Sequence, residues 1–193
     1  FIGLGNRGDR DIFYWMACTR LNYCDESGKE TPLRKKLGMV LVRGGHGVQG
    51  MFIPPKKEYP YNHPKFRGDE NKPKDPYVST GEYSGDTNGD GELSYFEAHP
   101  EWYGLRKGKR SDRPDVESGD NFCTSNMDAD KELAKNLVQS LIDGEWKNVD
   151  IVNIWMLDNG KWCECENCKK QGIYTDRLMD VAYVVQKEIQ KAQ

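Results

Sequence analysis

The chain has 193 residues, of which 36% are hydrophobic and 31% are charged, and its 28 Lys and Arg against 31 Asp and Glu give a net charge of −3. This length fits one ordinary domain with a buried core, and an aromatic content of 11% argues against disorder. The charge balance gives no electrostatic basis for binding nucleic acid or an anionic membrane, and no apolar run approaches the roughly 18 residues of a membrane span.

Short apolar runs alternate with helical patterns at the start of the chain. Apolar runs predict strands at residues 1–4, 21–24 and 38–43. Apolar spacing predicts a helix at 11–18, and Thr31 is the expected N-cap of a short helix that ends at Leu37.

From Pro54 to about Leu93 the pattern fails. Prolines recur too often for a central strand or helix, at positions 54, 55, 60, 64, 73 and 76. We predict that residues 54–98 form a surface excursion inserted in one domain that spans residues 1–193. A loop of this length is usually functional or tied down locally.

Regular patterns return after Phe122. We predict a helix at 127–142, a strand at 150–157 that is buried on both faces and places Trp155 in the core, and a helix at 175–189. Counting the first strand gives four strand–helix units, which favours an α/β fold with a parallel sheet. Four units make half of a (β/α)8 TIM barrel, and a small doubly wound sheet is the alternative.

Residues 86–97 match the twelve-residue EF-hand calcium loop at each diagnostic position. Side-chain oxygens recur at alternate positions, Gly91 permits the sharp turn, and the last residue offers a bidentate carboxylate. There is no second hand, so we expect a structural Ca²⁺ site rather than a sensor, with a solvated acidic turn as the alternative. The expected ligands are Asp86, Asn88, Asp90, Glu92 through its carbonyl, Ser94 and Glu97.

Three cysteines fall within six residues, at Cys163, Cys165 and Cys168. Three thiolates can converge on one tetrahedral Zn²⁺, with Cys123 or a distant group as the fourth ligand. Disulfides within the cluster and to Cys123 are the competing reading, and inert thiols are a third.

Four blocks of the sequence, at residues 45–54, 99–110, 122–126 and 158–168, resemble the bacterial DUF4838 family. Its members are mostly secreted or surface proteins, related to glycoside hydrolases such as α-glucuronidases and family 20 glycosidases. The resemblance implies a (β/α)8 barrel and a carbohydrate-active role. The excursion with its calcium loop departs from the family pattern.

In such barrels the chemistry lies at the carboxyl ends of the strands. We therefore predict Asp158 as a general acid or orienting group and His46 as a sugar ligand or proton shuttle. A loop cap for Asp158 and an ordinary loop histidine for His46 are the alternatives. Glu101 is interpreted as a helix-start carboxylate, with a site residue as the alternative. The candidate substrate-binding residues are Arg7, Arg43, Trp102, Asn159 and Trp162.

Together these features predict an exported carbohydrate-active protein, a glycoside-hydrolase-like enzyme that acts on a polysaccharide or a glycan containing uronic acid. The alternative is a non-catalytic carbohydrate-binding or structural module stabilised by calcium, with zinc as a second candidate ion. The expected location is extracellular, periplasmic or at the cell surface. The chain starts at Phe1 without a signal peptide, so we expect a piece of a longer protein. The rest of that protein, or a second copy, would cover the open sheet edges.

Overall fold

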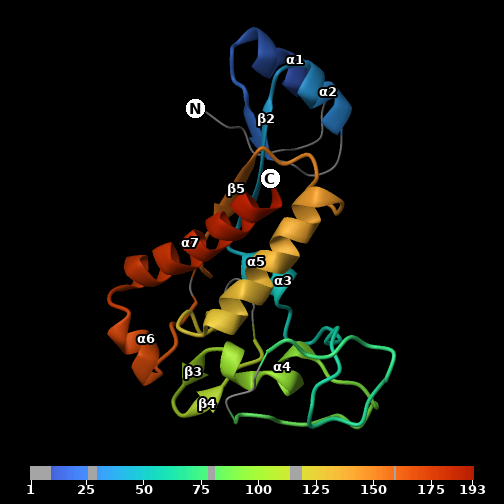
Figure 1. Ribbon diagram of the computed structural model, residues 1–193. Helices are drawn as coiled ribbons and strands as arrows, with labels where there is room; N and C mark the ends of the chain where they lie inside the picture. Colours follow the sequence, from blue (N-terminus) through green and yellow to red (C-terminus); the bar gives the residue numbers. More distant parts are fainter. Residues whose placement is uncertain (1–9, 26–29, 78–80, 114–118, 159) are drawn as a thin grey trace. The chain divides into compact units, whose positions relative to one another are not determined.

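The computed structural model describes residues 10–25, 30–77, 81–113, 119–158 and 160–193 (Figure 1). The chain divides into two compact units. Unit 1 consists of residues 1–45 and 137–154, and unit 2 consists of residues 46–136 and 155–193.

Unit 1 contains a three-stranded parallel sheet in the order β1-β2-β5, formed by β1 (Tyr23–Asp25), β2 (Val40–Gly45) and β5 (Ile151–Ile154) (Figure 1). Three of the predicted strands are therefore present and parallel, and the chain is a mixed α/β protein. The predicted strand at 1–4 lies outside the described residues. The described strands do not close into a barrel.

Two helices of unit 1, α1 (Arg10–Cys18) and α2 (Thr31–Lys36), follow the predicted positions. Thr31 is not the N-cap, because α2 starts after Glu30, which occupies the left-handed region at φ 53° and makes no side-chain cap. The apolar side chains of this part form a buried cluster that consists of Phe13, Met16, Cys24, Met39 and Leu41.

The excursion of unit 2 runs between α3 (Val48–Phe52) and α4 (Tyr95–Ala98). Its described residues form no helix and no strand ladder. Two isolated bridges hold the backbone, one between Glu58 and Ser94 and one between Asn62 and Lys74. Buried tyrosines supply the packing that regular structure would otherwise give: Tyr59, Tyr61 and Tyr95.

The remaining elements of unit 2 are short, apart from its last helix. They are the 3₁₀ turn η1 (Pro100–Trp102), the antiparallel pair β3 (Leu105–Arg106) and β4 (Lys109–Arg110), α6 (Glu166–Lys170) and α7 (Tyr174–Ala192). The helix α5 (Met127–Ile142) has the predicted bounds and belongs partly to each unit.

The last strand is shorter than predicted. β5 ends at Ile154, and the side chain of Trp155 is 55% exposed instead of lying in the core. The strand ends here because two side chains occupy backbone groups that a longer strand would pair with its neighbour. The backbone N–H of Leu157 donates to Asn121 Oδ1 at 2.8 Å, and the carbonyl of Met156 contacts His46 Nδ1 at 2.6 Å. Among the described helices, none combines the length and apolar character that a transmembrane span requires.

Candidate functional site

Four cysteine sulfurs of unit 2 lie around one point. The sulfur of Cys123 is 3.7 Å from the sulfurs of Cys163, Cys165 and Cys168. Sulfurs bound to a tetrahedral zinc at about 2.3 Å are about 3.8 Å apart, whereas a disulfide needs about 2.05 Å. All four thiols are free, so the arrangement can hold a metal ion.

Local backbone structure positions these sulfurs. Cys165 is the N-cap of α6, and its sulfur accepts the backbone N–H of Cys168 at 3.4 Å. The sulfur of Cys163 accepts the N–H of Leu105 at 3.3 Å, and the guanidinium of Arg110 lies 3.9 Å from it. Donors of this kind stabilise thiolate charge and fix the ligands before an ion binds.

The thiols share their protons unequally. Hydrogen bonds from Cys123 and Cys163 hold the pKa of Cys168 below its usual range. The hydrogen bond with Cys163 is the largest cause that raises the pKa of Cys123. A thiol that ionises readily is a metal ligand at neutral pH, because the thiolate is the coordinating form.

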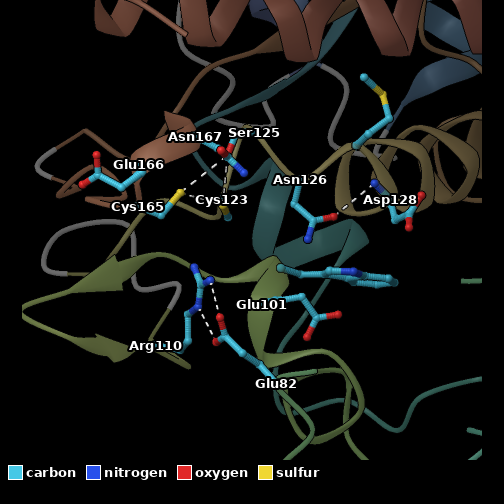
Figure 2. A pocket seen from close by; sticks show the side chains of 12 residues that line it. Glu82, Glu101, Arg110, Cys123, Ser125, Asn126, Asp128, Cys165, Glu166 and Asn167 are labelled. Atoms are coloured by element: carbon cyan, nitrogen blue, oxygen red, sulfur yellow. Dashed lines mark hydrogen bonds and ion pairs between the residues drawn. The ribbon is translucent and has the colours of Figure 1, made fainter. Parts of the chain in front are cut away.

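A cavity of about 450 Å³ adjoins the cysteine cluster (Figure 2). Cys123 and Cys165 contribute to its wall, so the cavity and the cluster share residues. Its size falls in the range of small-molecule sites. Carboxylates dominate its polar lining: Glu82, Glu101, Asp128 and Glu166.

Glu101 is the most buried of these carboxylates, with 4% of its surface exposed. One oxygen, Oε1, lies 2.7 Å from His99 Nδ1, and the other, Oε2, has no hydrogen-bond partner among the described residues. His99 Nε2 in turn lies 2.8 Å from Asp75 Oδ2. Because buried acceptors are almost always hydrogen-bonded, this oxygen is available to bind a water molecule, an ion or a substrate hydroxyl.

His99 sits between two carboxylates and stacks on Trp102 with ring centroids 4.3 Å apart. Burial is the largest single influence, lowering the pKa of His99 and raising that of Asp75, but the hydrogen bonds and charges around each group together outweigh it. The net pKa of His99 is therefore raised, with Glu101 contributing, and the net pKa of Asp75 is lowered. His99 thus fixes the position of Glu101.

Glu82 is engaged by a cation at the cavity wall. Figure 2 shows its carboxylate facing Arg110, which donates through Nε and Nη2 at 2.7 Å each. The hydrogen bond from Arg110 is the largest cause that lowers the pKa of Glu82. A bidentate pair holds both side chains rigidly, so Arg110 links Glu82 to the cysteine cluster.

A second group of potential metal ligands lies in the same unit. Ligand atoms of His63, Asp75 and His99 all lie within 4.8 Å of one another, and all three residues are buried. This group and the cysteine cluster are the arrangements of this kind that the described residues contain.

The EF-hand-like loop makes hydrogen bonds within itself. Asp86 accepts the N–H groups of Gly89 and Gly91 at 2.7 and 2.9 Å. Glu97 accepts from the N–H of Thr87 and of Ser94, both at 2.9 Å, and Ser94 caps α4. Burial raises the pKa of Glu97, but hydrogen bonds from the hydroxyl and backbone N–H groups of Thr87 and Ser94 together lower it to about 2.

The acidic ligands expected for calcium do not converge in this arrangement, since Asp86, Asp90 and Glu97 form no such group within 4.8 Å. Asp90 instead accepts the N–H of Glu92, and Asn88 accepts that of Asp90, each at 2.9 Å. Short polar side chains of this kind commonly bond to backbone amides two to five residues away, as they do in this loop.

The predicted catalytic pair lies outside the cavity. Asp158 is exposed over 70% of its side chain and lies 3.8 Å from His46, whose ring packs edge-on against Trp155 at 5.1 Å. Of the predicted substrate-binding residues, Trp102 lines the cavity from a buried position. Trp162 stacks on Tyr174.

The other predicted substrate ligands are placed as follows. In unit 1, Arg43 pairs with Glu145 at 3.2 Å. Arg7 and Asn159 lie outside the described residues. The cavity thus unites Trp102, Cys123 and Cys165 from the sequence predictions with Glu101 and with three acidic residues that those predictions did not name: Glu82, Asp128 and Glu166.

Sequence reasoning missed the buried network of Asp75, His99 and Glu101. Its only local signal was the segment His99-Pro100-Glu101-Trp102, in which a histidine and a carboxylate are two positions apart. His63 and Asp75 lie in the proline-rich excursion, where no periodicity indicates which side chains are buried.

Comparison with known families identifies the chain. Residues 55–192 match the family described as a domain of unknown function, DUF4838, which is most of the chain. The chain belongs to this family, as the four sequence blocks predicted. No curated protein and no solved structure matches the chain significantly.

Proposed function

We propose that this DUF4838 protein is carbohydrate-active and resembles glycoside hydrolases, with the cavity beside the cysteine cluster as its sugar site. The main support for this proposal is the position of Glu101. Its buried carboxylate lies on the cavity wall, with one oxygen held by His99 and the other without a partner among the described residues. Glycosidic bond cleavage uses a positioned pair of carboxyl groups. The cavity offers the second from Glu82, Asp128 or Glu166.

Among these, Asp128 is the best second carboxyl group in the proposal. Glu82 is neutralised by Arg110 in a bidentate pair, and Glu166 binds Lys169 at 2.6 Å on an exposed helix. Asp128 is half-buried, and its ion pair with Lys131 is longer, at 3.3 Å. Arg110 would recognise the carboxylate of a uronic acid only if a ligand displaced Glu82.

In the proposed scaffold the parallel order β1-β2-β5 is part of a (β/α)8 barrel. The excursion and the cysteine-rich segment both follow carboxyl ends of adjacent parallel strands, β2 and β5, which is where barrel enzymes carry their sites. Further strands would come from the rest of a longer chain or from a second copy.

Two ions complete the proposal. Zinc at the four cysteines would have a structural role, because all four positions are filled by sulfur and none is left for a substrate. Calcium would draw Asp86, Asp90 and Glu97 together in the EF-hand-like loop, at the weak affinity typical of extracellular modules. This is consistent with the proposed location outside the cytoplasm.

The test uses the full chain loaded with zinc and calcium and a panel of neutral and uronic glycosides. We expect Glu101→Gln to reduce turnover by about 100-fold or more, the typical contribution of a positioned acid or base. Glu70→Gln, a change at an exposed residue of the excursion, serves as the matched control and leaves turnover unchanged.

Asp158→Asn is the comparison that decides between the two candidate sites. Because Asp158 lies outside the cavity, turnover should persist in this variant. Loss of turnover in Asp158→Asn with full activity in Glu101→Gln would overturn the assignment to the cavity. Sugar binding without turnover of any glycoside would instead favour the alternative, a non-catalytic carbohydrate-binding module.

A further inference from the structure

We propose that His63, Asp75 and His99 form a second metal site, which holds a divalent transition-metal ion, with zinc as the first choice. This site is distinct from the cysteine cluster, and it does not depend on the proposed carbohydrate function. The exposed fractions of the three residues are 2%, 6% and 0%, and their ligand atoms lie within 4.8 Å of one another.

The donor set determines the class of ion. Two imidazole nitrogens and one carboxylate oxygen suit zinc and its first-row neighbours better than calcium or magnesium, which prefer oxygen ligands alone. Three protein ligands leave a fourth position for a water molecule. The geometry therefore favours an open, three-ligand site, in contrast to the four sulfurs of the cysteine cluster.

An independent observation points to an occupant. His63 Nε2 is buried and has no hydrogen-bond partner among the described residues. Leaving such a group unsatisfied in the interior is energetically unfavourable. A bound ion would account for a histidine nitrogen that is sealed from solvent next to another histidine and a carboxylate.

Binding changes the protonation of both histidines. His63 Nδ1 accepts the N–H of Lys65 at 3.2 Å, so the neutral ring carries its proton on Nε2. Coordination through Nε2 moves that proton to Nδ1 and gives up the Lys65 bond, which is near the long end of the normal range. His99 releases its Nε2 proton to solvent and keeps the Nδ1 proton that it shares with Glu101.

The surrounding contacts hold the ligands in place. Asp75 Oδ1 accepts the hydroxyl of Tyr59 at 3.0 Å and the N–H of Tyr77 at 2.8 Å, which leaves Oδ2 on the side of His99. A histidine whose second nitrogen faces a carboxylate is the usual outer arrangement of a metal ligand, and His99 has it through Glu101.

Stacking fixes both rings as well. The ring of His63 lies parallel to Tyr83 at 4.4 Å, and that of His99 lies parallel to Trp102 at 4.3 Å. Rings held against an aromatic face lose little freedom when an ion binds, which increases affinity.

The position in the chain gives the ion a structural role. His63 and Asp75 come from the excursion, and His99 directly follows α4. The backbone of the described part of the excursion forms isolated bridges in place of a strand ladder. An ion that joins its two halves to the end of α4 would stabilise a segment that has no secondary structure of its own.

The experiment measures bound zinc by elemental analysis of the full chain, with calcium in excess to fill the EF-hand-like loop. We expect His63→Asn to bind one zinc ion fewer per chain than the wild type. His46→Asn is the matched control, because His46 is the remaining histidine and lies outside the cluster. Unchanged zinc content in His63→Asn would overturn the proposal.

A second measurement does not require that variant to fold. Cobalt bound to thiolates gives intense charge-transfer absorption, whereas cobalt at nitrogen and oxygen ligands gives only weak bands. With calcium in excess, titration of the wild type should show one cobalt ion per chain with the intense absorption and a second ion with the weak bands alone. A wild type that binds a single cobalt ion per chain, with the intense absorption, would overturn the second site.

Hydrogen exchange provides the structural readout. Saturating zinc should slow amide exchange in residues 58–77 of the wild type more than in the same residues of His63→Asn, because the two proteins share the cysteine cluster and differ only at the second site. Equal slowing in both proteins would contradict the structural role of the second ion.

Discussion

The ammonium group of Lys35 lies 2.7 Å from Asp150 Oδ1, although 115 positions separate the two residues. The other oxygen of Asp150 accepts the backbone N–H of Leu41 at 2.8 Å. The residue before β5 is thereby tied to β2 and to the end of α2, within unit 1. This contact fixes where β5 starts.

Asp150→Ala should destabilise unit 1 in a pH-dependent way. Burial raises the pKa of Asp150, but the hydrogen bonds from Lys35 and Leu41 lower it below its ordinary value. A lowered folded pKa contributes stability above the unfolded pKa of about 3.9, and this is lost as pH falls through the folded pKa. We expect a loss of about 1 kcal/mol at pH 7, since the pair is partly exposed.

Denaturant unfolding at pH 7 and near pH 3 measures this difference. Lys35→Met is the partner variant, which removes the ion pair and leaves the Leu41 bond in place. An equal penalty for Asp150→Ala at both pH values would show that packing, and not charge, is responsible.

The cysteine cluster should control the stability of unit 2 through its ion. Cys123→Ser removes one of four ligands, and we expect a loss of at least about 3 kcal/mol, which lowers the melting temperature by about 6–12 °C in a chain of this size. Cys18→Ser is the control, because Cys18 is exposed and outside the cluster. A strong chelator should lower the melting temperature of the wild type by more than that of Cys123→Ser, because the wild type also loses the ion of the cysteine cluster.

Calcium should raise the melting temperature through the EF-hand-like loop. At a calcium concentration 100 times the dissociation constant, the expected stabilisation is about 2.7 kcal/mol. Asp86→Ala should abolish this increment, whereas Asp69→Ala, outside the loop, should retain it. Magnesium serves as the ion control because it fits such loops poorly. If Asp86→Ala keeps the full calcium increment, the loop is not the calcium site.

Gly44 is required by the contact between β2 and β5. A Cβ on this residue would lie 2.0 Å from the carbonyl oxygen of Asn153, its register partner. Gly44→Ala should therefore cost more than about 3 kcal/mol, as strain and clash combine. Gly45→Ala is the matched control: its φ is also positive, at 97°, but a Cβ there meets open space. In thermal unfolding, the melting temperature of Gly44→Ala should be well below that of Gly45→Ala.

Much of the regular structure could be predicted because its signals are local. The apolar stripe that includes Leu133 and Leu137 predicted α5 with its observed bounds, and both side chains are buried. The β-branched run before Gly44 predicted β2. The end of β5 could not be predicted, because the competing acceptor Asn121 lies 36 positions away.

The two candidate metal sites differ in the same respect. Cys163, Cys165 and Cys168 are close in sequence, so their spacing already suggested shared ligation, and only Cys123 had to be placed by folding. His63, Asp75 and His99 are brought together by a segment without periodicity, and nothing in the sequence indicates that their side chains are buried. The oxygen of Glu101 that lacks a hydrogen-bond partner among the described residues could not be predicted either, because no sequence pattern indicates such an atom.

The cysteine cluster also closes a ring. Cys123 precedes α5 and β5, and its three partners follow them. A bound ion would therefore close residues 123–163 into a circuit that consists of the backbone and of metal–sulfur bonds. A protease cut at an exposed turn inside this circuit, such as the one at Gly144, would leave two fragments joined through metal–sulfur bonds. Such a nicked molecule should migrate as one particle in mild denaturant and come apart when the ion is withdrawn.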